Sequence, residues 1–199
     1  MNNSIRFLYG GAISCVIPRK FEDLSNILPL PDHQEVYIYH TTSTEDSISA
    51  NNIQPSDCVL SFEVLSHVAG KDQESVARLL FDDLVVCNEA DDASLFLCRS
   101  ARLAKPLRIN HKVTFATGSM KIARGRGRYK DQGRTISASL YILSMPEYNC
   151  DMLITYNFPM DDEGINYEAE LAMFEELAST LDIIDEKLFC ANKGQDNKS

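Results

Sequence analysis

The stretch Pro31-Asp32-His33-Gln34-Glu35-Val36-Tyr37-Ile38-Tyr39 organises this chain, because it joins a polar turn to a strand of β-branched and aromatic residues. Proline fixes its own φ and biases the residue before it toward extended geometry, so Asp32 follows a stiff corner. From Val36 onward the side chains alternate between the two faces of the predicted strand. Asp32 and Glu35 are therefore expected at the mouth of a strand, on backbone that a sheet holds in place.

The residues alone leave two interpretations of these carboxylates open. In the first, Asp32 bonds to nearby backbone N–H groups and stabilises a turn, while Glu35 is a solvated charge at a strand edge. In the second, the two carboxylates form an acid and base pair. No second catalytic group lies nearby in the sequence, and we therefore do not expect an enzyme.

Length and composition predict one globular domain. The 199 residues are enough for a sizeable core, and we predict a single domain over 1–191 with a disordered polar tail over 192–199. Hydrophobic residues make up 44% of the chain and charged residues 24%, as in ordinary soluble proteins. No apolar run is long enough to predict a membrane span. The N-terminus lacks the features of a secretory signal or transit peptide, so we expect a protein of the nucleus and cytoplasm.

The six cysteines and four histidines are scattered, without a C-x-x-C pair or the spacing of metal ligands. Most of the cysteines lie in apolar runs, where a reduced thiol acts as a small hydrophobe. We therefore expect neither a disulfide framework nor a zinc site. The sequence also contains no motif for a nucleotide or another cofactor, so no cofactor is predicted.

The net charge of −10 is distributed unevenly. Residues 147–186 carry twelve acidic side chains and no Lys or Arg, whereas 121–134 carries six basic side chains and one acidic. Such a field steers association with a partner of complementary charge. The Arg-Gly repeats within 124–128 resemble an RNA-binding tract, but a solvated hairpin with basic edges is the preferred interpretation. Because an acidic surface repels phosphates, no nucleic-acid partner is expected.

The other segments predict a sheet with helices before and after it. Gly10-Gly11 between two apolar runs indicates a hairpin, since both glycines can take φ > 0. The polar segment 40–55 is typical of a surface loop. Helices are predicted over 58–69, 72–84 and 167–181, and strands over 94–99, 112–126, 134–145 and 151–158.

Hydrophobic spacing supports these assignments. The predicted helix at 58–69 has apolar residues three apart from Val59, with Ser56 or Asp57 as its N-cap. The helix at 167–181 has the clearest apolar stripe, which is more typical of core than of a binding face. Alternation in 134–145 predicts one buried and one wetter face. Short links favour antiparallel pairing, so the predicted class is α+β, an antiparallel sheet sandwiched between helices.

The sequence also resembles a known family. Leu8-Tyr9-Gly10-Gly11-Ala12-Ile13, followed by Pro31-Asp32-x-Gln34-Glu35-Val36-Tyr37, is similar to the N-terminal signature of the Ran guanine nucleotide release factor (Mog) family. The likeness covers most of residues 6–190 and includes 143–154. The chain departs from the family pattern in a longer loop over 41–55 and in Cys58, where the family often has Ser.

The resemblance implies α/β/α layers, as in the photosystem subunit PsbP, and a protein that binds the small GTPase Ran. It further implies release of guanine nucleotide from Ran in support of nuclear import, without catalytic residues, and other Ran-binding proteins could cooperate. The family's two Ran-contacting carboxylates fall on Asp32 and Glu35. Gln34 and Tyr37 are further candidates, although both could simply pack. The rival interpretation is an acidic adaptor that binds a basic partner through the 147–186 surface and releases no nucleotide.

Overall fold

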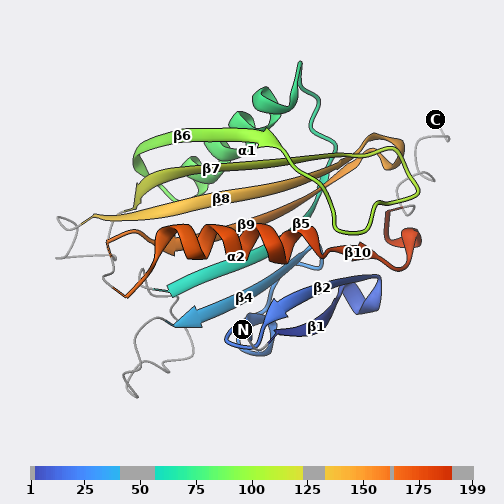
Figure 1. The fold of residues 1–199 in the computed structure, drawn as a ribbon, viewed down its shortest axis with the longest axis horizontal. Coiled ribbons are helices and arrows are strands. Elements are labelled where there is room, and N and C mark those ends of the chain that lie inside the picture. Colours follow the sequence, from blue (N-terminus) through green and yellow to red (C-terminus); the bar gives the residue numbers. More distant parts are fainter. Residues whose placement is uncertain (1–2, 41–56, 123–132, 162–163, 190–199) are drawn as a thin grey trace.

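The computed structural model describes residues 3–40, 57–122, 133–161 and 164–189, which form two antiparallel sheets and two α-helices (Figure 1). The strands are β1 (Asn3–Leu8), β2 (Ile13–Pro18), β3 (Glu22–Asp23), β4 (Gln34–His40), β5 (Asp57–Ser66), β6 (Asp91–Ser100), β7 (Lys112–Ile122), β8 (Arg134–Met145), β9 (Cys150–Pro159) and β10 (Asp182–Ile183), and the helices are α1 (Gln73–Cys87) and α2 (Tyr167–Ser179). The large sheet has the order β3-β4-β5-β9-β8-β7-β6, and the small sheet has the order β1-β2-β10.

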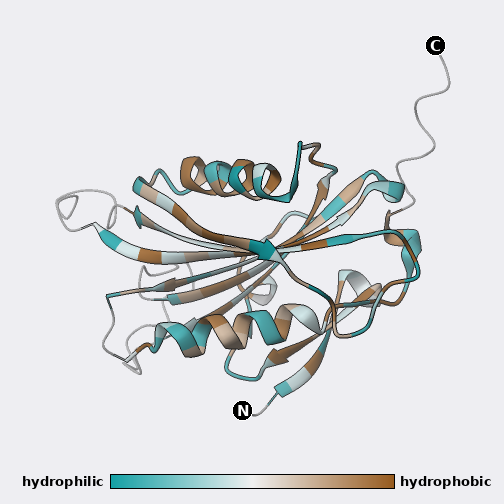
Figure 2. Cartoon of the chain, turned by 45° about the horizontal axis from the view of Figure 1, so that its top comes forward, coloured by the Kyte–Doolittle hydropathy of each residue, from teal (hydrophilic) through white to brown (hydrophobic). Residues whose placement is uncertain are grey.

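The two α-helices cover opposite faces of the large sheet (Figure 2). Helix α1 packs Leu80 and Phe81 on one face, and α2 packs Phe174 and Leu177 on the other. The strand pairs of the described residues are antiparallel, and β6 to β9 follow one another as the short links predicted. The predicted α+β class, with an antiparallel sheet between helices, is therefore confirmed.

The helix predicted over 58–69 is wrong, because this segment forms strand β5. Cys58, Leu60 and Phe62 are fully buried on one face of the sheet, with the two-residue alternation of a strand. The strand lies between β4 and β9, so both of its edges are paired, and Val59 on its other face packs against a separate cluster that includes Leu24 and Ile38. The three-residue spacing from Val59 is therefore fortuitous, because it combines residues from opposite faces of one strand.

The predicted N-cap of that helix also has a different role. Asp57 begins β5, and its carboxylate lies 2.8 Å from Nδ1 of His40 on β4. The helix predicted over 72–84 is confirmed as α1, which begins after Asp72. The Asp72 side chain accepts a hydrogen bond from the Ser75 N–H at 2.8 Å and satisfies one of the free donors of the first turn.

Strand β8 has no wet face, contrary to the predicted alternation. Ser137 and Ser139 are fully buried like the apolar residues between them, because a helix covers each face of the sheet. Ser139 compensates for its burial with a hydrogen bond to Thr117 on β7, at 2.9 Å. The amphipathic pattern of β8 thus reflects polar side chains inside the protein, not exposure to solvent.

Other predictions are confirmed within the described residues. The Gly10-Gly11 hairpin joins β1 to β2, and both glycines have positive φ, 64° and 97°. The apolar stripe of 167–181 faces the main core, by which we mean the largest cluster of buried residues, which includes Leu8, Tyr37 and Phe62. His40, the first residue of the loop predicted over 40–55, belongs instead to β4. Residues 41–55, most of the basic segment 121–134 and the tail 192–199 lie outside the described residues, so the domain bounds remain a prediction. In the part of the chain that is described, no helix is both long and apolar enough to cross a bilayer.

Candidate functional site: an acidic corner at the start of strand β4

The Pro31–Gln34 turn places Asp32 on the surface at the start of β4. The Gln34 N–H donates to the Pro31 carbonyl at 2.9 Å and closes the turn. The Val64 N–H donates to the His33 carbonyl at 3.0 Å, which ties the same turn to β5. Asp32 is exposed on this backbone, so its carboxylate is available to a partner from a fixed position.

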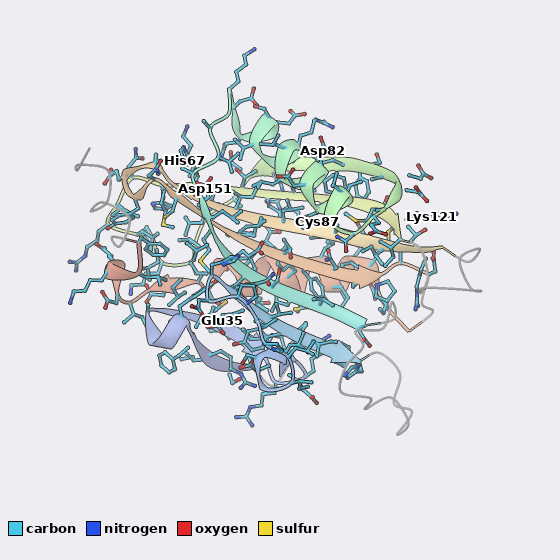
Figure 3. The ribbon with its side chains drawn as sticks, turned by 180° about the vertical axis from the view of Figure 1, so that it is seen from behind. Glu35, His67, Asp82, Cys87, Lys121 and Asp151 are labelled. Carbon is cyan, nitrogen blue, oxygen red and sulfur yellow. The ribbon has the colours of Figure 1, made fainter. Side chains whose placement is uncertain are left out.

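Glu35, labelled in Figure 3, is in contrast half-buried and bonded to the turn that joins β1 to β2. Its carboxylate accepts a hydrogen bond from the Tyr9 backbone N–H at 2.5 Å. Tyr9 has a φ of 51°, a left-handed conformation that is uncommon for a residue with a side chain. We call Asp32, Glu35 and the Pro31–Gln34 turn the acidic corner.

The Tyr9 side chain contacts the corner as well. Its hydroxyl oxygen lies 2.9 Å from the Phe62 carbonyl oxygen and 3.2 Å from that of His33, so its single proton can bond to either. The residue thus connects the hairpin, β5 and the turn that carries Asp32. The two separated pieces of the sequence signature, around Gly10 and around Asp32, therefore meet in one structural unit.

The environment of Glu35 disfavours the ionised form of its carboxyl group. Burial raises the pKa of the Glu35 carboxyl above its usual value; the Tyr9 N–H opposes this effect, and the nearby Asp23 carboxylate adds to it. Carboxyl groups with a shifted pKa recur at functional sites, so Glu35 is a candidate functional residue. The bond to Tyr9 nevertheless gives Glu35 a second, structural role.

Changing Glu35 to glutamine is expected to alter the pH dependence of stability. A folded-state pKa above the unfolded value means that Glu35 stabilises the fold at low pH and loses that contribution as pH rises through its folded pKa. Glutamine keeps an acceptor for the Tyr9 N–H but cannot ionise. Thermal melts from acid to neutral pH should show Glu35→Gln gaining on the wild type as pH rises. If the melting temperature of Glu35→Gln instead gained on that of the wild type as the pH falls, the expected sign would be contradicted.

A shallow hollow of about 510 Å³ lies beside the corner. Leu28, Leu30 and Leu188 give it an apolar wall. Tyr9 and the carboxylates of Asp32 and Glu35 also line it. An aliphatic stem that ends in a cation fits such a lining, because its methylenes can contact the wall while its charge meets the carboxylates. The arrangement can bind a lysine or arginine side chain of another molecule.

The four predicted site residues are placed differently. Asp32 is exposed, whereas Glu35 and Gln34 are half-buried beside the hollow. Tyr37 is only 3% exposed and packs edge to face on Phe62, with ring centroids 6.1 Å apart. Tyr37 therefore presents almost no surface to a partner, because its strand turns this ring toward the main core.

Sequence reasoning missed the part of the site that Tyr9 and Asp23 supply. Tyr9 adjoins the Gly10-Gly11 pair, and that adjacency was the one available indication of an unusual backbone at this residue. Nothing in the sequence pairs it with Glu35, which lies 26 positions away. Across the residues that the structure describes, no cluster of His, Cys, Asp and Glu is suited to hold a metal ion.

Solved structures of Mog1 proteins share the fold of this chain and define its class. The crystal structure of the Saccharomyces cerevisiae Ran-binding protein Mog1p matches with a TM-score of 0.68 and 22% identity, covering 95% of this chain and 99% of that chain. A mutant of protein Mog1 matches with a TM-score of 0.67 and 21% identity, covering 95% and 100%.

The sequence family described as "Ran-interacting Mog1 protein" matches residues 6–159, and the chain belongs to this family. The Ran guanine nucleotide release factor of Bos taurus is 27% identical, covering 92% of this chain and 94% of that protein. The nuclear import protein MOG1 of Saccharomyces cerevisiae is 22% identical, covering 95% and 86%.

Proposed function

We propose that this protein binds the GTPase Ran through the acidic corner, promotes release of its guanine nucleotide and thereby supports nuclear import. The supporting observation is the exposed Asp32 beside a half-buried Glu35, on backbone held by Tyr9, in a chain of the Ran-interacting Mog1 family. The protein acts in the nucleus and cytoplasm. It works as a regulator and needs no catalytic residue.

The mechanism follows from differential binding. The carboxylates pair with a lysine or arginine of the GTPase, and charge-assisted hydrogen bonds of this kind are among the stronger ones. When those cations also help to hold the nucleotide or its loops, the complex favours a state with lower nucleotide affinity. The coupling is reciprocal, so bound nucleotide also weakens the complex by the same factor.

The rival interpretation, an acidic adaptor, is disfavoured because acidic residues of its proposed surface already have partners within the protein. Of the twelve acidic residues in 147–186, several already bind partners within the protein. Asp151 is fully buried, Glu175 pairs with Arg99 at 2.6 Å, and Asp182 pairs with Lys105 at 2.7 Å. The acidic surface over 147–186 is therefore less available to a basic partner than the sequence suggested.

One experiment tests the proposal directly. Ran loaded with a fluorescent guanine nucleotide is mixed with excess unlabelled nucleotide, and the release rate is measured with and without this protein. We expect faster release that saturates with protein concentration. An unchanged rate together with tight binding would favour an adaptor, and absence of binding would contradict the whole proposal.

Changing Tyr9 to phenylalanine should loosen the corner without removing a carboxylate. The change deletes the hydroxyl that binds the Phe62 and His33 carbonyls, and such a bond contributes about 1 kcal/mol to stability. We expect a loss of that size in urea unfolding and a weaker complex with Ran, because the turn that carries Asp32 is held less firmly.

Tyr141→Phe is the matched control for this variant. The Tyr141 hydroxyl donates to the Arg102 carbonyl at 2.6 Å, so its removal also deletes one bond to a backbone carbonyl. Stability should fall by a similar amount in both variants, whereas Ran affinity should fall only for Tyr9→Phe. Equal affinities would show that Tyr9 supports the fold alone.

A further inference from the structure

Two large apolar side chains are exposed on strand β1. Ile5 and Phe7 are 64% and 66% exposed, and β1 is an edge strand of the small sheet. Residues two apart in a strand point to the same face, while the intervening side chains point to the other. Leu8, on the opposite face, is fully buried in the main core. Ile5 and Phe7 therefore project from the side of the small sheet that faces away from the core.

The apolar area extends onto the neighbouring strand, β2. Val16 of β2 is paired with Ile5 and is half-buried on the same face. Toward β10 the face becomes polar, because Ser14 lies opposite Phe7 and Asp182 lies opposite Ser14. We call Ile5, Phe7 and Val16 the outer apolar face.

This face adjoins the acidic corner through Tyr9. Phe7 precedes Tyr9 by two residues, and Glu35 binds the Tyr9 N–H. Consecutive Cα atoms are about 3.8 Å apart, so the Cα atoms of Phe7 and Tyr9 lie within about 7.6 Å. Figure 1 shows β1 and β2 on the β4 side of the molecule, away from β6. A single partner can therefore contact the corner and the outer apolar face together.

The corner alone is too small for a specific complex. Stable protein interfaces bury about 800 Å² on each partner, and most of their energy comes from a few well-packed anchors, often aromatic. Charged groups at a rim mainly set orientation and association rate. Phe7 is 66% exposed and precedes Tyr9, which binds Glu35, by two residues, and this position suits it as an anchor.

A second copy of this chain is a less suitable occupant of the face. Two copies that met through their outer apolar faces would bring together two chains that each carry a net charge of −10. Like charges that face each other across an interface cost binding energy. A partner with cations next to an apolar surface avoids that repulsion and uses both features.

We propose that the outer apolar face is the hydrophobic part of the surface that binds the GTPase, with Phe7 as its anchor. The inference rests on the proposed function and extends it from a charged corner to a composite interface. The corner orients the GTPase, and Phe7 supplies the contact that slows its dissociation. Charge-based recognition and apolar affinity thus come from two neighbouring parts of the fold.

The test compares Phe7→Thr with Phe96→Thr in the full chain. Phe96 is 54% exposed on β6, which is likewise an edge strand, so the two substitutions are alike in chemistry and setting. Threonine suits strands and removes the aromatic ring. Titration against Ran should show about 10- to 30-fold weaker binding for Phe7→Thr and near wild-type binding for Phe96→Thr, with the melts of both close to wild type.

Salt dependence separates this surface from the corner. The loss caused by Asp32→Lys should shrink as salt screens the charges, whereas the loss caused by Phe7→Thr should persist. Normal binding by Phe7→Thr, with binding by Asp32→Lys impaired, overturns this inference and leaves the proposed function standing. Wild-type self-association that Phe7→Thr abolishes, with Ran affinity unchanged, assigns the face to a second copy and also overturns it. A wild type that does not bind Ran contradicts both.

Discussion

Exchanging Asp32 for lysine and Glu35 for glutamine together is expected to weaken the complex with Ran about 100-fold and to abolish accelerated nucleotide release. The lysine at position 32 meets the cations of the GTPase with a like charge on an exposed, rigid turn. Glutamine at position 35 removes the second charge but keeps the acceptor for the Tyr9 N–H. The fold should therefore survive, and the loss should appear in Ran titrations and in the release rate.

Glu176→Lys provides the matched charge control. Glu176 is exposed on the last turn of α2, within the 147–186 segment, and a lysine there suits the carboxyl end of the helix. Near wild-type release by this variant, with none by the double variant, would locate the interaction at the corner. The opposite result would favour the acidic adaptor.

Changing Asp151 to alanine is expected to destabilise the fold by about 3–5 kcal/mol, which corresponds to a Tm about 10 °C lower for a protein of this size. Asp151 is fully buried, and its carboxylate accepts three hydrogen bonds. The donors are His67 Nδ1 at 2.8 Å, the Val68 N–H at 2.7 Å and the Ser144 hydroxyl at 2.8 Å. Alanine leaves these donors without an acceptor and adds a cavity.

Asp151→Asn and Asp32→Ala show whether the bonds carry this effect. Asparagine keeps the volume and one acceptor oxygen, so its cost should be clearly smaller than that of alanine. Asp32 is an exposed aspartate, and its replacement by alanine should leave the melt unchanged. Equal melts for Asp151→Ala and Asp32→Ala would refute a structural role for the buried carboxylate.

The Asp151 variants should still release nucleotide. Figure 3 shows His67 and Asp151 as a cluster separate from Glu35, so nucleotide release per folded molecule should persist.

The residues by themselves predicted much of the fold. The Gly10-Gly11 hairpin, the helices α1 and α2, and strands β7 to β9 follow from turn chemistry, capping and hydrophobic period. The start of β4 was likewise predicted from Pro31 and the alternation after it. These features depend on interactions between residues close in the chain, which is why the sequence alone could predict them.

The tertiary structure decided which of the candidate residues reach the surface and which segment becomes a central strand. Strand β5 forms because β4 and β9 lie on either side of it, and Tyr37 is buried because its face of β4 meets the main core. Glu35 is bonded to Tyr9 across 26 positions, and Asp151 is joined to His67 across 84. Such pairings depend on how strands assemble, and local propensity carries no information about them. The sequence therefore determined the elements and the acidic motif, and packing between distant segments determined the surface that the motif presents.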